Sequence, residues 1–179
     1  MSDLVTRAAD FAKAAHESIN QRRKYSDQPY IVHPATVAEI VKSVTEDPVV
    51  LAAAWLHDVV EDTPVTLEEV RIEFGDEVAR LVDDLTDVAQ KSDGNRKQRL
   101  AIDRAHTATA DPRAKTVKLA DVIHNLSDIL DAPRGFAFQY LEEKQQLLEA
   151  LLDGDRHLLR RAQQVIDAAR EQLSGKGAP

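Results

Sequence analysis

The residues with the clearest chemical potential are His57 and Asp58, followed one helical turn later by Glu61 and Asp62. They lie in the otherwise largely apolar stretch Ala52–Thr63, whose spacing predicts a helix. In such a helix His57 stacks with Glu61, and Asp58 stacks with both acidic residues, so three carboxylates crowd one face. Burying these charges unpaired is costly. A divalent metal ion held by imidazole and carboxylate removes that cost, so the pattern predicts a metal site.

Two adjacent residues supply only two metal ligands, so further ligands must come from distant parts of the chain. His33 stands at the expected start of a helix that opens with proline, and its imidazole therefore projects from a fixed position. Asp121 lies in the run 116–126, where apolar residues occupy most of the helix circumference and a carboxylate needs a partner. The alternative to a metal site is a buried hydrogen bond between the adjacent histidine and aspartate.

The absence of cysteine restricts any metal ligands to nitrogen and oxygen atoms. This set suits an octahedral divalent ion such as Mn²⁺, Mg²⁺, Fe²⁺ or Co²⁺ better than a tetrahedral structural zinc.

The order His33, His57-Asp58, Asp121 resembles the H…HD…D pattern of the HD-domain metal-dependent phosphohydrolases. More narrowly, the flanking residues are similar to the hydrolase domain of the RelA/SpoT homologue family. The matching blocks are RKY (23–25) before PYIVHP (29–34), AWLHDVVEDT (54–63), and VKLAD (117–121) with Asn125 and Leu126. The resemblance extends from about residue 9 to about residue 140 and fades after Asn125.

The resemblance implies three groups of site residues. The ligands of one Mn²⁺ ion are His33, His57, Asp58 and Asp121. The residues that position and activate the attacking water are Glu61 and Asp62. The residues that contact the base, ribose or phosphates of a nucleotide are Arg23, Lys24 and Asn125. Weaker candidates for substrate contacts are Lys118, Tyr140 and Lys144, while His124 lies next to the site without a ligand position.

Simpler explanations exist for several of these residues. Glu61 and Asp62 would ordinarily be solvated carboxylates that close a helix. Arg23 and Lys24 would be surface cations in a basic turn, and Asn125 a helix-surface or capping amide.

The implied activity is Mn²⁺-dependent hydrolysis of the 3′-pyrophosphate of ppGpp or pppGpp, which leaves GDP or GTP and pyrophosphate. One alternative is an HD phosphohydrolase of another nucleotide, such as an adenosine alarmone or a 2′- or 3′-phosphorylated cofactor. The other is a catalytically silent HD module that binds a nucleotide or a partner protein.

The apolar spacing predicts an all-α, single-domain helical bundle of the HD type. The expected helices are Leu4–Asn20, Pro34–Val44, Pro48–Val60, Thr66–Phe74, Asp76–Thr86, Arg96–Ala108, Asp111–Leu130, Phe136–Leu151 and Arg156–Leu173. Asp47 before Pro48 and the pair Thr66 and Glu69 are good helix starts, and Asp76 is expected to cap the helix after Gly75.

With 179 residues and 43% hydrophobic content, we expect one hydrolase domain over residues 1–173 and a disordered tail over 174–179. At this length we expect no fused synthetase, and we therefore expect the chain to resemble the stand-alone small alarmone hydrolases.

The net charge of −8 argues against nonspecific binding of nucleic acid. Basic residues still cluster locally near the proposed ligands, which allows a small phosphorylated substrate. Residues 1–6 have neither the basic start nor the apolar run of a signal peptide, and the sequence has no run of roughly 18 apolar residues, so we expect a cytoplasmic protein without a membrane partner. The oligomeric state stays open, because the last two helices could complete the core or meet a second copy.

Overall fold

The computed structural model describes residues 3–24 and 26–175, and the regular secondary structure of this part is helical. The α-helices are α1 (Asp3–Ser18), α2 (Val32–Lys42), α3 (Pro48–Leu56), α4 (Val59–Asp62), α5 (Leu67–Phe74), α6 (Asp76–Leu85), α7 (Arg96–Thr109), α8 (Pro112–Asn125), α9 (Arg134–Leu148) and α10 (Arg156–Gly175). Short 3₁₀ turns are η1 (Lys91–Asp93), η2 (Ile129–Asp131) and η3 (Glu149–Leu151). The predicted all-α fold is confirmed.

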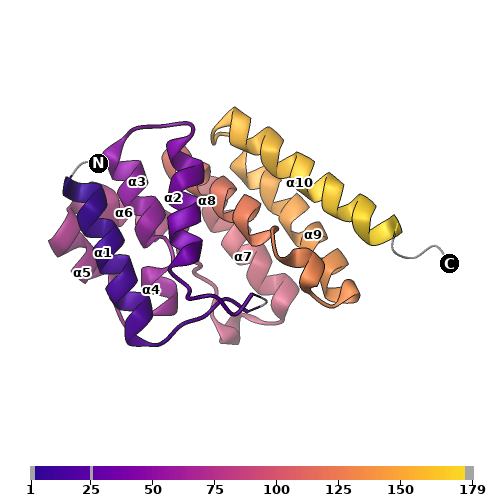
Figure 1. The fold of residues 1–179 in the computed structure, drawn as a ribbon, viewed down its shortest axis with the longest axis horizontal. Coiled ribbons are helices and arrows are strands. Elements are labelled where there is room, and N and C mark those ends of the chain that lie inside the picture. The colour runs from indigo at the N-terminus through magenta and orange to yellow at the C-terminus, as the bar shows by residue number, and fades with distance from the viewer. Residues whose placement is uncertain (1–2, 25, 176–179) are drawn as a thin grey trace.

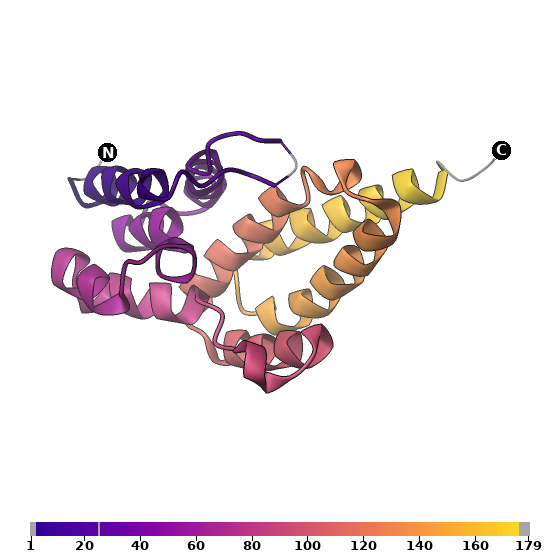
Figure 2. The ribbon, with the colours of Figure 1, turned by 90° about the horizontal axis from the view of Figure 1, so that it is seen from below.

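Helix α8 lies at the centre of the molecule. Figures 1 and 2 show α1–α6 on one side of it and α7, α9 and α10 on the other. It packs against α2, α3 and α6 on the first side and against α10 on the second. Accordingly, Val117, Leu119, Ala120 and Val122 of this helix are completely buried. A polar residue on α8 can therefore meet side chains from helices that are distant in the sequence.

The connection 19–31 between α1 and α2 extends away from α1 toward the junction of α8 and α9 (Figure 2). It folds back on itself through an isolated antiparallel bridge between Arg22 and Pro29. The backbone N–H of Tyr30 then donates to the carbonyl of Gln21 at 3.0 Å. This turn carries the predicted substrate-binding residues Arg23 and Lys24 next to α8.

Several helix starts follow directly from the sequence. The Asp47 side chain accepts a hydrogen bond from the Val49 N–H at 2.9 Å, with Pro48 at the first helical position of α3. Thr66 and Glu69 form the predicted reciprocal cap of α5. The expectation that Asp76 caps α6 was wrong, because Gly75 occupies the cap position with a positive φ of 89°.

The predicted continuous helix Pro48–Val60 is divided in two. Helix α3 ends at Leu56, α4 starts at Val59, and Asp58 between them has φ −104° and ψ −3°. Adjacent side chains on a continuous helix point about 100° apart, so they do not converge on one point. The break lets His57 and Asp58 face the same centre. Residues 49–60 contain no glycine or proline, and the sequence therefore gives no local signal for this break.

Other boundaries also differ from expectation. Helix α8 ends at Asn125 instead of Leu130, and η2 follows it. Helix α10 continues to Gly175, so residues 174 and 175, which we expected in the tail, are helical. The predicted disorder of residues 176–179 falls outside the described residues. Within the described part of the chain, none of the helices combines the length and apolar character that crossing a membrane requires.

Candidate metal centre and adjoining pocket

Four side chains from three distant segments of the chain bring one donor atom each to the same point. The Nε2 atoms of His33 and His57 lie 3.1 Å apart. Oδ2 of Asp58 is 3.1 Å from the His57 Nε2 and 3.4 Å from the His33 Nε2. Oδ1 of Asp121 is 3.2 Å from the His33 Nε2 and 3.8 Å from the His57 Nε2. We call His33, His57, Asp58 and Asp121 the metal centre below.

The second ring nitrogen of each histidine is engaged elsewhere. Nδ1 of His57 donates to the carbonyl of Ala54 at 2.8 Å, so the Nε2 atom of a neutral His57 carries a lone pair and no hydrogen. Nδ1 of His33 lies 2.7 Å from Nδ1 of His124, and the two rings stack at 4.9 Å. When the proton of this contact sits on His33, its Nε2 also presents a lone pair to the centre.

The electrostatics of this centre favour added positive charge. Burial alone would lower the pKa of His57, but the Asp58 and Asp121 carboxylates and the Ala54 carbonyl together outweigh burial and raise that pKa to about 9. Burial would raise the pKa of Asp58, yet the two imidazoles hold it well below its usual value. In the protein without a metal ion, protons on the two histidines supply the positive charge that stabilises the ionised carboxylates.

A divalent metal ion fits the same donor set. His33, His57 and Asp58 offer nitrogen and oxygen atoms close enough to bind one ion together. Asp121 adds an oxygen on the side of His33. Lone pairs that face each other at 3.1 Å repel unless a proton or a cation lies between them, and one divalent ion can take the place of the proton between these two buried imidazoles.

Hydrogen bonds from two neighbouring side chains fix the orientation of the Asp58 and Asp121 carboxylates. The Tyr30 hydroxyl donates to Oδ2 of Asp58, and the Asn125 amide donates to Oδ1 of Asp121 at 2.5 Å. No role for Tyr30 followed from the sequence, although it lies within a matching block, because its partner is 28 residues away. Such contacts orient metal ligands and are a recurrent part of metal sites.

Lys118 lies on the same face of α8 as Asp121. Its ammonium is 3.8 Å from Oδ1 of Asp87 and 3.9 Å from Oδ2 of Asp121, and its side chain is 14% exposed. Burial would lower the pKa of Lys118, but the charges of Asp121, Asp87 and Glu61 raise it. The lysine therefore carries a permanent positive charge beside the metal centre.

Glu61 and Asp62 diverge instead of sharing one crowded helix face. A carboxylate oxygen of Glu61 accepts from the backbone N–H of Asp87 at 3.3 Å. Glu61 is exposed overall, but loss of water around its carboxylate and the nearby Asp87 raise its pKa to about 7. Asp62 turns toward the connection 19–31, where Oδ2 accepts from the Gln21 amide at 2.7 Å.

The three predicted substrate-binding residues line one pocket of about 230 Å³, called the adjoining pocket below. Arg23 and Lys24 come from the connection 19–31, and Asn125 comes from the end of α8. The remaining lining residues are Tyr30, Asp128, Ile129, Phe136 and Tyr140. Because Asn125 also contacts Asp121, the pocket opens next to the metal centre.

Arg23 is not the exposed surface cation that its sequence context suggests. Its side chain is 8% exposed, and it donates to Oδ2 of Asp128 through Nη2 at 2.7 Å and through Nε at 3.1 Å. Lys24 is exposed, and its ammonium lies 5.4 Å from the centre of the Phe136 ring. Asp128 was missed from the sequence, because nothing near it in the chain indicates a partner 105 residues away.

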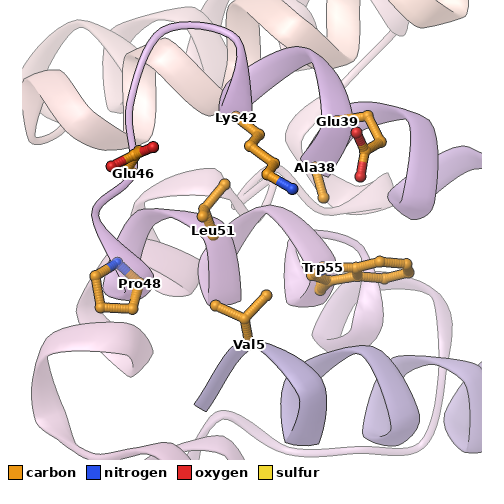
Figure 3. Close-up of a pocket in the computed structure, with 8 residues that line it drawn as sticks. All are labelled: Val5, Ala38, Glu39, Lys42, Glu46, Pro48, Leu51 and Trp55. Atoms are coloured by element: carbon orange, nitrogen blue, oxygen red, sulfur yellow. The ribbon is translucent and has the colours of Figure 1, made fainter. Parts of the chain in front are cut away.

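A larger cavity, of about 350 Å³, lies away from these residues between α1, α2 and α3. Figure 3 shows Val5, Leu51 and Trp55 pointing into it, with Glu39, Lys42 and Glu46 around them. Its floor is apolar and includes none of the metal-centre residues. Size alone therefore does not locate the chemistry of this protein.

Comparison with known proteins identifies the family. A model of the HD domain matches residues 8–151. The chain is 39% identical over 170 residues to guanosine-3′,5′-bis(diphosphate) 3′-pyrophosphohydrolase MESH1 of Mus musculus, covering 93% of this chain and 90% of the mouse protein. It is 42% identical over 159 residues to MESH1 of Homo sapiens, covering 84% and 86% of the two chains. This chain belongs to the MESH1 family of HD-domain proteins.

A solved structure agrees with this MESH1 membership. It belongs to a metazoan ortholog of SpoT that hydrolyzes ppGpp, and it matches this chain with a TM-score of 0.83 at 30% identity. The match covers 94% of this chain and 96% of that chain. The predicted family and the HD-type bundle are therefore confirmed, and the HD domain implies a divalent metal ion, which His33, His57 and Asp58 could hold together.

Proposed function

We propose that this protein hydrolyses the 3′-pyrophosphate of ppGpp or pppGpp, releasing pyrophosphate and GDP or GTP. The observation that carries the proposal is the convergence of four donor atoms beside a pocket lined by Arg23, Lys24 and Asn125. The MESH1 relatives are named for this activity, and this chain matches 90% of the mouse protein and 86% of the human protein.

We assign one Mn²⁺ ion to the metal centre, with His33, His57, Asp58 and Asp121 as its ligands. Two imidazoles and two carboxylates suit an octahedral divalent ion, and the resemblance to the RelA/SpoT hydrolase domain implies that this ion is Mn²⁺. When bound, such an ion lowers the pKa of a coordinated water and polarises a phosphoryl oxygen. Tyr30 and Asn125 hold the carboxylates that would face it.

Glu61 and Asp62 have the role of handling the protons of the attacking water. A carboxylate with a pKa of about 7 is suited to accept a proton near neutral pH, and Glu61 has such a value. Attack at the phosphorus next to O3′ breaks the bond to the ribose, and the departing oxygen takes up a proton. Lys118, permanently charged behind Asp121, offsets the negative charge that accumulates in this region.

The adjoining pocket has the chemistry of a nucleotide site. Phe136 and Tyr140 stack on each other at 5.7 Å and offer aromatic surface, while Lys24 supplies an exposed positive charge. Arg23 is already paired with Asp128, so its flat guanidinium is better suited to stack on a base than to neutralise a phosphate. Asn125 places an amide between the pocket and the metal centre, where the ribose of a bound nucleotide would lie.

The test is to incubate the purified protein with Mn²⁺ and ppGpp and to separate the products by chromatography. We expect pyrophosphate and GDP. Turnover of an adenosine alarmone or a 2′- or 3′-phosphorylated cofactor in preference to ppGpp would assign a different substrate. Absence of turnover with every nucleotide would indicate a catalytically silent binding module.

We place this activity in the cytoplasm, where guanosine nucleotides are found, and fractionation of cells tests that location.

A further inference from the structure

His16 is a buried polar residue that the proposed chemistry does not use. It lies near the end of α1 and is 1% exposed. Its ring is 4.8 Å from the ring of Tyr30, whose hydroxyl contacts Asp58. His16 therefore stands directly behind the residues that surround the metal centre, although α1 contributes none of the predicted site residues.

A chain of hydrogen bonds joins His16 to Asp62. This chain determines which ring nitrogen of His16 carries the hydrogen. An ionised carboxylate only accepts hydrogen bonds, so the Gln21 NH₂ group must face Oδ2 of Asp62, at 2.7 Å. The Gln21 carbonyl oxygen then faces Nδ1 of His16, at 2.6 Å. Because that oxygen also only accepts, the hydrogen of a neutral His16 ring is on Nδ1.

The other nitrogen of His16 is a buried acceptor. Nε2 has no hydrogen-bond partner among the described residues. Burial lowers the pKa of His16, and it outweighs the opposing effects of Gln21, Asp58 and Asp62. The ring thus holds Gln21 with a neutral N–H and adds no charge to a region already rich in carboxylates.

Both backbone polar groups of Gln21 form hydrogen bonds. Its N–H donates to the His16 carbonyl at 3.1 Å, and its carbonyl accepts from the Tyr30 N–H at 3.0 Å. Its side chain therefore has little freedom once His16 fixes the amide orientation. Within the described residues, Oδ1 of Asp62 has no hydrogen-bond partner, so the oxygen that Gln21 does not hold is available for chemistry.

We propose that His16 is a positioning residue that acts through Gln21 to aim the Asp62 carboxylate at the reacting water. The proposal rests on the proposed function for the role of Asp62. Loss of His16 lets the Gln21 amide rotate, and Asp62 then loses a fixed orientation. A misplaced catalytic group lowers the rate of the chemical step more than it weakens substrate binding.

The first test compares His16→Phe and Gln21→Met in steady-state hydrolysis of ppGpp. Phenylalanine keeps the ring packing on Tyr30 but has no N–H, and methionine keeps the length of Gln21 without its amide. We expect kcat to fall about 10- to 100-fold in each, with KM nearly unchanged. The exposed His157→Phe and Gln164→Met serve as matched controls and should retain full kcat. Should His16→Phe fail to fold, Gln21→Met carries the same test.

Two further variants separate positioning from packing. His16→Asn places an amide N–H where Nδ1 donates, and we expect it to recover most of the lost kcat. In an Asp62→Asn background, His16→Phe should cause no further loss, since the group to be positioned is already altered. A full additional loss in that background, or unchanged kcat in both His16→Phe and Gln21→Met, would overturn the proposal.

Nitrogen-15 NMR of the imidazole tests the relay independently of turnover. The wild-type spectrum should show His16 neutral with its hydrogen on Nδ1, and Gln21→Met should change that signal. A protein that hydrolyses no ppGpp but shows this tautomer contradicts the proposed function and leaves the relay intact. The opposite tautomer, with the hydrogen on Nε2, contradicts the relay itself.

Discussion

The metal centre and the adjoining pocket share α8, but they are built from different kinds of structure. The donors of the centre sit within helices or at helix ends, and the two histidines are 1% exposed. The pocket takes Arg23 and Lys24 from the connection 19–31 and its aromatic wall from α9. Rigid helices suit chemistry that needs fixed distances, while connections tolerate changes in ligand shape. We therefore expect substitutions in the two regions to affect different kinetic constants.

The largest effect should come from removing a donor of the metal centre. Asp58→Asn keeps the size of the side chain but loses the charge that pairs with both imidazoles. We expect at least a 1,000-fold loss of turnover, together with loss of Mn²⁺ measured by elemental analysis of the purified protein, because ligand charge is needed to hold a divalent ion. Full metal content with full turnover would show that Asp58 is not a ligand.

Glu61→Gln should lower kcat by about 10²- to 10⁴-fold, the usual contribution of a proton-transfer group, while Mn²⁺ stays bound. The pH profile adds a second observation. A base must be ionised to act, so the wild-type rate should fall as pH decreases through the pKa of Glu61, at or below about 7 once a nearby cation favours the ionised form. If the rate of Glu61→Gln still fell as pH decreases through this range, another group would be the base that accepts the proton of the attacking water.

Tyr30→Phe sharpens the comparison, because Tyr30 contacts both regions. Its hydroxyl donates to Asp58, and its ring lines the adjoining pocket. Removal of the hydroxyl alone should weaken Mn²⁺ binding about 10- to 100-fold, since second-layer hydrogen bonds orient metal ligands. Isothermal titration with Mn²⁺ measures this change. Unchanged Mn²⁺ affinity with a raised KM would place the role of Tyr30 in the pocket alone.

The smallest effect should come from Lys24→Ala. Lys24 is exposed and contacts the pocket wall at Phe136, so its loss should raise KM for ppGpp about tenfold while leaving kcat and thermal stability close to wild type. Lys42→Ala, on the rim of the larger apolar cavity, is the matched control and should change neither constant. An equal loss of kcat in Lys24→Ala would mean that Lys24 acts in the chemical step.

The same contrast explains how far the sequence predicts the molecule. Helix content follows from apolar spacing, and the starts at Asp47 and Thr66 follow from local capping chemistry. The break at Asp58 has no local signal, because residues 49–60 contain neither glycine nor proline. Pairs such as Arg23 with Asp128 depend on contacts across the whole fold, and no pattern within a single sequence encodes them.

Residue identity was predictable where chemistry restricts it, and orientation was not. The four proposed ligands were found from their types and order, and the structure brings their donor atoms together. The expectation that Glu61 and Asp62 crowd one face with Asp58 was wrong, because α4 directs Asp62 toward Gln21 and Glu61 toward Asp87. Their assigned roles in catalysis stay predictions.

The most direct test of the metal centre is a crystal structure of the protein grown with Mn²⁺, with anomalous diffraction measured at the manganese absorption edge. We expect a single anomalous peak between the Nε2 atoms of His33 and His57, Oδ2 of Asp58 and Oδ1 of Asp121. A peak elsewhere, or none with these four atoms still together, would contradict the proposal that one ion organises this site.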